Sequence, residues 1–193
     1  MCIRDRGQHF TVEEMESKIG VADKYKRFFR RWLKIFENEN FIKEEQDGFC
    51  RTSKSWKVDV AAEWDYLWGV EKQLNYGEGF VRYLEKCSKS LTQLFRNEIA
   101  PLELLFPHGE MTTAVDTYQK TLSSKILNHM AECAVLEAYS EKKGKVFRIL
   151  EVGAGVGGTS DGIIERLSEQ NVEYYYTDVS TYCLLYTSPS PRD

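Results

Sequence analysis

The fold is decided by the segment Val146-Phe-Arg-Ile-Leu-Glu-Val152, which runs directly into Gly153-Ala-Gly-Val-Gly-Gly158. The first of these segments has the continuous apolar character of a buried strand. The glycines after it predict a tight turn, because glycine adopts positive φ at little cost. Residues 159–168 then have the spacing of an amphipathic helix. The apolar face of that helix consists of Ile163, Ile164 and Leu167.

A second strand and an acidic residue complete the pattern. Residues 172–177, Val-Glu-Tyr-Tyr-Tyr-Thr, read as a strand that ends in Asp178. The order strand, glycine loop, helix, strand, acid predicts the βαβ start of a doubly wound α/β sheet. Gly153 and Gly155 would leave bare backbone for a ligand, and Gly158 would let the helix pack close to the strand. The Asp178 carboxylate could accept hydrogen bonds from both hydroxyls of a ribose.

The acidic residue before the glycines helps to distinguish between two possible cofactors of the adenosyl type. A nicotinamide dinucleotide and S-adenosylmethionine would both suit the glycine loop. Glu151 lies one residue before that loop. A carboxylate there would repel a pyrophosphate and attract a cationic amino-acid group, which favours S-adenosylmethionine. The structural alternatives are a solvated strand-end acid for Glu151 and a helix N-cap for Asp178.

Residues 149–159 resemble motif I of class I S-adenosylmethionine-dependent methyltransferases. Three further segments narrow the resemblance: Tyr175-Tyr-Thr-Asp-Val-Ser180, the upstream Pro101-Leu-Glu-Leu-Leu-Phe-Pro-His-Gly-Glu110, and Thr117-Tyr-Gln119. Together they are similar to the methyltransferase domains embedded in modular polyketide synthases and polyketide–peptide hybrids. The resemblance is good over residues 98–182 and weaker upstream.

This resemblance implies a truncated Rossmann-like α/β core behind a mostly helical lid or linker. It also implies methyl transfer, at carbon or oxygen, from S-adenosylmethionine to an acyl chain on a carrier-protein phosphopantetheine arm. Tyr118 would cover the cofactor from the lid side, unless it is an ordinary packed tyrosine. No catalytic residue is assigned, because those of the family lie after later strands. The implied cofactor-binding residues are Glu151, Val152, Gly153, Ala154, Gly155, Gly157, Gly158, Thr159, Asp178, Val179 and Tyr118.

The composition excludes several classes of protein. The 193 residues are 42% hydrophobic and 13% aromatic, which is too apolar for a disordered chain. No apolar run is long enough to cross a membrane. The net charge of −4 gives no general attraction to nucleic acid. Cys50, Cys87 and Cys133 are widely spaced, which predicts no metal site and a reducing, cytoplasmic setting.

The region 7–57 has the order of a winged-helix unit. A capping box at residues 11–14 opens a short helix that ends near Gly20. Residues 25–36 form a helix with one aromatic face and one basic face. Two short strands follow about an Asp47-Gly48 turn. The basic helix could recognise DNA, but the acidic surroundings favour a solvated basic face.

The region 58–140 is predicted to be a helical lid or linker. Its helical pattern is broken at residues 75–79, and a loop is expected over residues 101–109. One long helix is expected from Thr112 or Thr113 to about Tyr139. The α/β domain would then occupy residues 141–182.

The two ends of the chain are expected to be translated sequencing adapter. Residues 183–188 back-translate to TGT CTC TTA TAC ACA TCT, whose reverse complement contains ATG TGT ATA AGA GAC and so encodes residues 1–5. Natural termini have no reason to be reverse complements. We therefore exclude residues 1–6 and 183–193 from fold reasoning. The native part would then be an internal fragment that lacks the catalytic half and is inactive as written, with covalent neighbour domains in a longer protein.

Two other functions stay open. One is a stand-alone small-molecule methyltransferase whose winged-helix region mediates dimerisation. The other is a winged-helix DNA-binding regulator with an attached ligand domain.

Overall fold

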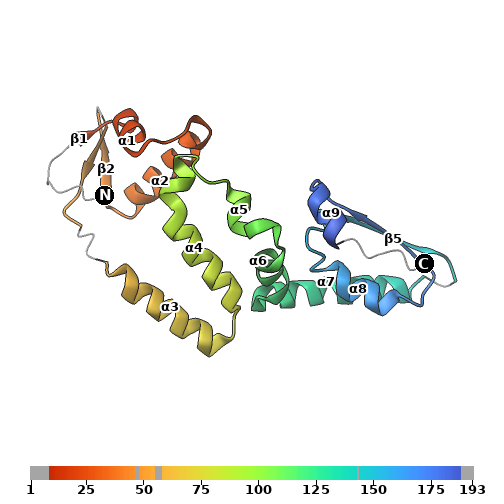
Figure 1. Cartoon of the computed structure of the whole chain (residues 1–193). Coiled ribbons are helices and arrows are strands. Elements are labelled where there is room, and N and C mark those ends of the chain that lie inside the picture. The colour runs from red at the N-terminus through yellow and green to blue at the C-terminus, as the bar shows by residue number, and fades with distance from the viewer. Residues whose placement is uncertain (1–8, 47, 55–57, 143, 188–193) are drawn as a thin grey trace. The chain divides into compact units, whose positions relative to one another are not determined.

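The computed structural model describes residues 9–46, 48–54, 58–142 and 144–187. The Asp47 side of the expected hairpin turn and most of the two expected adapter segments lie outside these residues. The described chain forms two compact units, which are considered separately (Figure 1). The first unit comprises residues 9–66 and 85–104, and the second comprises residues 67–84 and 105–187.

The first unit combines a small antiparallel sheet with helices. The sheet order is β1-β3-β2, so the chain forms a β2–β3 hairpin and adds β1 to the other edge of β3. The two predicted strands of this region are therefore confirmed. The elements are β1 (His9–Phe10), α1 (Val12–Ile19), α2 (Lys26–Asn38), β2 (Ile42–Glu45) and β3 (Gly48–Arg51).

The first helix begins and ends as its sequence predicts. The Glu14 backbone N–H donates to the Thr11 hydroxyl at 3.1 Å, and the Thr11 N–H donates to the Glu14 carboxylate at 3.0 Å. This is a complete capping box, which satisfies two N–H groups at the helix start. Gly20 ends the helix in the left-handed conformation with φ 79°.

The core of the first unit is built on the aromatic face of α2. Phe29 and Leu33 of that helix are buried with Phe95, which lies in the last turn of α4 (Glu78–Phe95). The Phe95 ring centroid lies 5.6 Å from that of Phe29 and 6.4 Å from that of Trp32. Such edge-to-face contacts add to the free energy of area burial. The amphipathic pattern of residues 25–36 is thus confirmed.

Carboxylates accompany the basic face of α2. The Arg30 guanidinium donates to the buried Glu16 carboxylate at 2.8 Å, and the Lys34 ammonium lies 2.7 Å from that of Glu44. These pairs reduce the positive charge that a nucleic-acid backbone would meet. The helix–helix–hairpin order is present, and the winged-helix interpretation remains a prediction.

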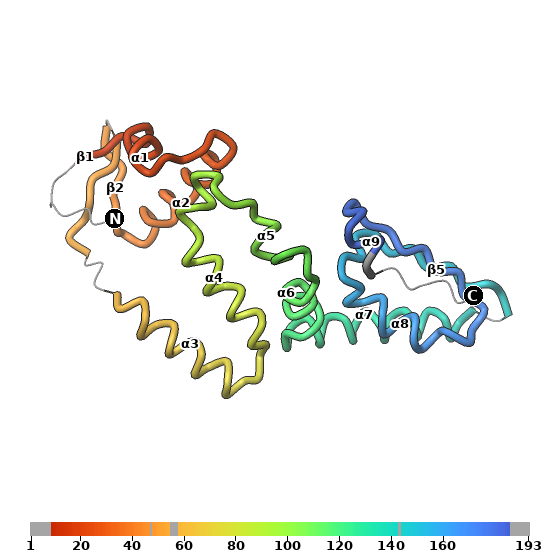
Figure 2. The backbone as a smooth tube through the Cα atoms, viewed as in Figure 1, coloured from red at the N-terminus to blue at the C-terminus, as the bar shows by residue number. Residues whose placement is uncertain are grey.

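Two long helices follow, α3 (Val60–Leu74) and α4, and the chain turns between them at residues 75–77 (Figure 2). Asn75 and Gly77 have positive φ angles of 47° and 151°. A glycine at the second position is required because a Cβ there would lie 3.1 Å from the Thr121 Cα. The predicted break between the helices is confirmed.

Two expectations for the next segment are wrong. Residues 101–109 are not a plain loop, because Pro101–Leu105 forms the short helix α5 and Pro107–Gly109 a 3₁₀ turn. Proline is well suited to the first position of a helix, and Leu104 is buried.

The single long helix is also broken. The chain forms α6 (Thr112–Val115) and a π-helical turn over Asp116–Lys120, and then begins α7 (Leu122–Ser140). Thr121 is extended, with φ −66° and ψ 150°, and its hydroxyl accepts the Ser124 N–H at 3.1 Å. A threonine that caps a new helix competes with continuation of the old one, and periodicity alone does not reveal this.

The α/β part of the second unit contains the predicted motif. β4 (Phe147–Val152) and β5 (Val172–Thr177) pair in parallel, with Leu150 opposite Tyr175, and α8 (Ser160–Leu167) connects them. The short helix α9 (Thr181–Thr187) follows β5. The βαβ start of an α/β sheet is thus confirmed.

The prediction that β4 is buried holds for only one of its faces. Phe147 is buried, but Leu150 is 67% exposed and Val152 is 81% exposed. No described element covers that outer face of the two-stranded sheet. A continuous apolar run indicates two covered faces in a parallel sheet, so the outer face has the composition of a core surface without its cover.

No described helix combines the length and apolar character that a membrane span requires. No group of three or more His, Cys, Asp or Glu side chains within the described ranges is placed to hold a metal ion.

We expect Phe95→Ala to lower the free energy of unfolding of the first unit by about 3–5 kcal/mol, because it removes a buried ring from an aromatic cluster. Chemical denaturation followed by circular dichroism measures this loss. Tyr66→Ala is the control, since that side chain is 72% exposed and its removal should change stability by less than about 0.5 kcal/mol. Equal effects of the two substitutions would contradict this packing.

Candidate functional site

The glycine loop leaves β4 in a conformation that only glycine adopts freely. Gly153, Gly155 and Gly157 have φ angles of 78°, 59° and 77°. The N–H groups of Gly153 and Ala154 donate to the Thr177 carbonyl at 2.9 and 3.0 Å. The loop is therefore tied to the end of β5, and its backbone lies at the carboxyl edge of the sheet, where α/β proteins bind ligands.

Asp178 holds the same loop from the other strand. Its carboxylate accepts the Gly155 N–H at 2.8 Å through Oδ2 and the Ser180 N–H at 2.7 Å through Oδ1. The Tyr176 hydroxyl donates to the Gly155 carbonyl at 2.9 Å. Asp178 thus has a structural task in this loop, in addition to any ligand it could bind.

Glu151 is held in place by two hydroxyl groups. The Tyr174 hydroxyl donates to Oε2 of Glu151 at 2.8 Å, and the Ser160 hydroxyl makes a short hydrogen bond to the same oxygen. Oε1 has no hydrogen-bond partner among the described residues. Ser160 has an exposed fraction of 0%, so this support lies inside the protein. Burial, together with the bond to Glu151, raises the pKa of the Tyr174 hydroxyl well above its usual value and keeps it a donor.

The π-helical turn is fastened to the glycine loop by two amide side chains. The Gln119 amide donates to the Val156 carbonyl at 2.8 Å and to the Asp161 carboxylate at 3.2 Å. The Asn128 amide donates to the Tyr118 carbonyl at 3.1 Å. Single π-helical turns occur frequently at functional sites. Partial burial raises the pKa of the Asp161 carboxyl, and the bond from Gln119 opposes this.

A cavity of about 450 Å³ lies between the π-helical turn and the glycine loop. It brings together many of the residues predicted from the sequence, namely Tyr118, Glu151, Gly153, Ala154, Gly155, Gly158 and Thr159. The other predicted residues do not line it. Val152 and Val179 are exposed, Asp178 supports the loop, and Gly157 lies within the loop backbone.

The cavity also contains residues that the sequence analysis did not assign. Leu105 and Phe106 contribute an apolar wall, and Val156 and Asn128 complete the lining. The apolar character of residues 101–109 was a signal for the wall. Asn128 gave none, because a single amide in a helix has no distinctive spacing. Cys183 also lines the cavity, but it belongs to the expected adapter segment, and no functional role is assigned to it.

Comparison with known proteins supports a family assignment, although no protein-family model matches the sequence. Pyochelin synthetase PchF of Pseudomonas aeruginosa is 26% identical over 172 residues, which cover 86% of this chain and 10% of that protein. Polyketide synthase PksR of Bacillus subtilis is 27% identical over 187 residues, which cover 90% of this chain and 7% of that protein.

Two solved structures are similar over nearly the whole chain. The DszA carbon methyltransferase matches with a TM-score of 0.83 and 26% identity, over 95% of this chain and 48% of that one. The CurJ carbon methyltransferase matches with a TM-score of 0.81 and 26% identity, over 94% of this chain and 48% of that one.

The fold is a mixed α/β fold, and the comparisons show which domains it resembles. The chain is a relative of the carbon methyltransferase domains of polyketide synthases and related peptide synthetases, and it matches the N-terminal part of such a domain. It spans about half the length of these solved domains and a tenth or less of the synthases named above. The resemblance stated from the sequence is confirmed.

We expect Gly158→Ala to destabilise the second unit by about 1–3 kcal/mol, because the new Cβ would lie 2.8 Å from the Tyr118 carbonyl oxygen. Gly69→Ala in α3 is the matched control, since no heavy atom beyond its chain neighbours and its own helix backbone lies within 4 Å of its Cβ position among the described residues. That change should stabilise the helix by about 0.5–1 kcal/mol. Thermal denaturation of both variants measures the difference, and shifts of the same sign would contradict the close packing of loop and turn.

We expect Tyr174→Phe to cost about 1.5 kcal/mol of stability, because it removes a hydrogen bond to a charged, half-buried carboxylate. Tyr175→Phe is the control on the adjacent residue. Its hydroxyl donates to Glu173 at 3.3 Å and also interacts with Arg148, and both partners are exposed, so the loss should stay below about 0.5 kcal/mol. Chemical denaturation of the two variants tests the expectation. A larger loss in Tyr175→Phe would show that Glu151 is not held as described.

Proposed function

We propose that this chain is the cofactor-binding half of a carbon methyltransferase domain that uses S-adenosylmethionine. One observation carries the proposal: Glu151, whose Oε1 has no hydrogen-bond partner among the described residues, and the bare backbone of the glycine loop line the same cavity. A carboxylate beside exposed glycine backbone suits a ligand that has a cationic amino-acid end and a nucleoside end.

The residues present fit this cofactor. The cavity volume of about 450 Å³ is in the usual range for small-molecule sites. Glu151 would bind the amino group through Oε1, while Ser160 and Tyr174 hold its other oxygen. The glycine backbone from Gly153 to Gly158 would lie against the adenosyl part. Asp178 does not line the cavity, but each of its oxygens accepts one backbone N–H, from Gly155 or Ser180, and retains a lone pair for a ribose hydroxyl.

The remaining predicted residues would have smaller roles. Val152, Gly157 and Val179 would shape the loop and the strand ends rather than touch the ligand. Tyr118 comes from the π-helical turn and lines the cavity together with the glycines, and its side chain is 54% exposed. In that position it would cover the bound cofactor and limit access of water.

The cofactor, when bound, supplies a methyl group already activated on a sulfonium. This chain's residues would bind and orient it, and alignment is the main contribution a protein makes to such a transfer. Carbon as the acceptor is supported by the two solved relatives, both carbon methyltransferases. Formation of a carbon nucleophile also requires a base. No residue of this chain is assigned that role, and we expect it in the other half of the domain.

The proposed methyl acceptor is an acyl chain held on a carrier protein. Its support is indirect: the matched relatives are long synthases of which this stretch is a small part. A domain within such a protein has covalent neighbours, and a growing chain reaches it on a tether. We further propose a cytoplasmic location, and domain limits of 7–57, 58–140 and 141–182 for the helical regions and the α/β start.

The proposal is tested by calorimetric titration of the full chain with S-adenosylhomocysteine, whose amino-acid end is the same as that of the methyl donor. We expect saturable binding, and we expect Glu151→Gln to weaken it by about tenfold or more, because the charged contact to the amino group is lost. Absence of binding to the unsubstituted chain would refute the proposal.

Glu173→Gln provides the matched control for this titration. It removes the same charge from the same sheet, but Glu173 pairs with Arg148 on the exposed face and lies outside the cavity. We expect its affinity to stay within about twofold of the unsubstituted chain. Equal weakening by both substitutions would mean that Glu151 acts only through net charge.

A further inference from the structure

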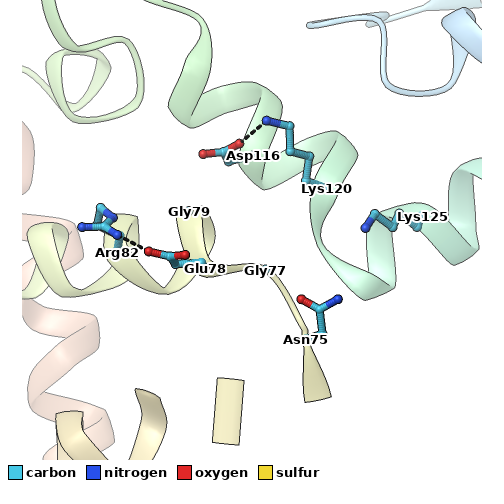
Figure 3. A pocket seen from close by; sticks show the side chains of 8 residues that line it. All are labelled: Asn75, Gly77, Glu78, Gly79, Arg82, Asp116, Lys120 and Lys125. Carbon is cyan, nitrogen blue, oxygen red and sulfur yellow. Dashed lines mark hydrogen bonds and ion pairs between the residues drawn. The ribbon is translucent and has the colours of Figure 1, made fainter. Parts of the chain in front are cut away.

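A second cavity, of about 370 Å³, lies in the same unit on the other side of the π-helical turn (Figure 3). Four pieces of chain form it: the turn between α3 and α4, the first turns of α4, the π-helical turn and the start of α7. Nearly every side chain in its lining is polar or charged. The lining residues are Asn75, Gly77, Glu78, Gly79, Arg82, Asp116, Lys120 and Lys125.

The walls of this cavity are fixed by close backbone contacts. The Leu122 N–H donates to the Tyr76 carbonyl at 2.6 Å, which joins the start of α7 to the turn after α3. The Gly77 N–H donates to the buried Glu71 carboxylate at 3.3 Å. A Cβ at Gly79 would collide with the Asp116 carboxylate at 2.1 Å, so side chain and backbone touch there. The cavity is therefore preformed, as ligand sites usually are.

Charged groups in the cavity are unevenly paired. The Arg82 guanidinium forms a short ion pair with Glu78, and the Lys120 ammonium lies 2.9 Å from the Asp116 carboxylate. Lys125 has no ion-pair or hydrogen-bond partner for its ammonium within the described part of the chain. In Figure 3 its side chain and the Asn75 amide both point into the opening. Three cationic side chains and two carboxylates line the cavity. Because Arg82 and Lys120 pair with the two carboxylates, the positive charge of Lys125 is not balanced within the lining.

Hydrogen-bond donors are in excess at that same side. An ammonium group has three N–H donors, and that of Lys125 has no partner within the described residues, whereas that of Lys120 is turned to Asp116 (Figure 3). The Asn75 amide adds further donors beside Lys125. An incoming group must therefore be an acceptor with several oxygens and a negative charge. Lysine is a common partner of phosphate, whose four oxygens can bond several donors at once.

We propose that this cavity binds a phosphate group through Lys125 and the Asn75 amide. The ligand is either free phosphate or the phosphate ester of a small organic molecule. The two paired carboxylates at the other side of the cavity would repel a second anionic group, which favours a ligand with a single phosphate. This proposal does not depend on the proposed methyl transfer, because none of its residues lines the cofactor cavity.

The position of the cavity gives the proposal a structural consequence. Asp116 and Lys120 line the phosphate cavity, whereas Tyr118, between them in sequence, lines the cofactor cavity. One π-helical turn thus contributes to both sites. A phosphate bound to Lys125 would lie at the start of α7, where the Ser124 hydroxyl donates to the Thr117 carbonyl of that turn at 3.0 Å, and the Gln119 amide of the same turn donates to the Val156 carbonyl of the glycine loop.

The test is a phosphorus NMR titration of the full chain with inorganic phosphate, and in a parallel arm with glycerol 3-phosphate, at constant ionic strength. We expect saturable binding in at least one arm. Lys125→Met retains the length of the side chain and removes the charge, so it should weaken binding by at least about fivefold. Lys86→Met is the matched control, because Lys86 is an exposed lysine of α4 outside the cavity, and it should change affinity by less than about twofold.

The comparison of the two arms identifies the source of the phosphate. Tighter binding of glycerol 3-phosphate would indicate an ester, and equal binding would indicate that the phosphate group alone is recognised. Circular dichroism of each variant confirms that the fold is retained. Absence of saturable binding in both arms, or equal weakening by Lys125→Met and Lys86→Met, would overturn the proposal.

Discussion

The hydrogen bond from the Gly155 N–H to the Asp178 carboxylate, 2.8 Å long, is the interaction on which the candidate site depends. It joins the loop after the first strand to the residue after the second, and thereby closes the carboxyl edge of the two-stranded sheet. The loop can reach that carboxylate only because Gly153 and Gly155 adopt positive φ. The same geometry leaves the loop backbone open toward the cavity, so that one constraint gives both local order and a surface for a ligand.

The Glu151 carboxylate is stabilised by two uncharged hydroxyl groups. A carboxylate in a half-buried position is unfavourable unless its oxygens are bonded. Here Ser160 and Tyr174 satisfy one oxygen, and the other has no hydrogen-bond partner among the described residues. The hydroxyl donors carry no charge, so the negative charge of Glu151 is preserved rather than neutralised. An arginine in the place of Tyr174 would stabilise the carboxylate more strongly but would compete with a cationic ligand.

The elements that the sequence revealed are those with strong local signals. The glycine segment, the capping box at Thr11 and the aromatic spacing of α2 each reflect a constraint within a few residues, and the structure contains all three. The break at Thr121 was missed because a threonine cap resembles any threonine in a helical pattern. The uncovered face of β4 was missed for another reason: composition records what a strand is suited to contact, not what lies beside it.

Only one part of the candidate site could be predicted from the sequence. The glycine loop and Glu151 come from one continuous segment, whereas the opposite wall of the cavity comes from Phe106, Tyr118 and Asn128, which no short motif connects. Their approach depends on the π-helical turn and on two side-chain hydrogen bonds, from the Gln119 amide to the Val156 carbonyl of the loop and from the Asn128 amide to the Tyr118 carbonyl of the turn. One extra residue in a helical turn rotates every later side chain, so this wall was beyond the reach of spacing rules that assume a regular helix.

The exposed outer face of the sheet bears on how strongly the site can hold a ligand. Leu150 and Val152 lie on β4 immediately before the loop, and they face away from the cavity side where Glu151 is held. The solved relatives are about twice as long as the matched region, so they have further chain that could cover such a face. Burial of these two side chains would stabilise the strand end from which the loop begins. The stiffness of the glycine loop, and with it the cost of ordering the site on binding, is therefore coupled to packing on the opposite face of the same strand.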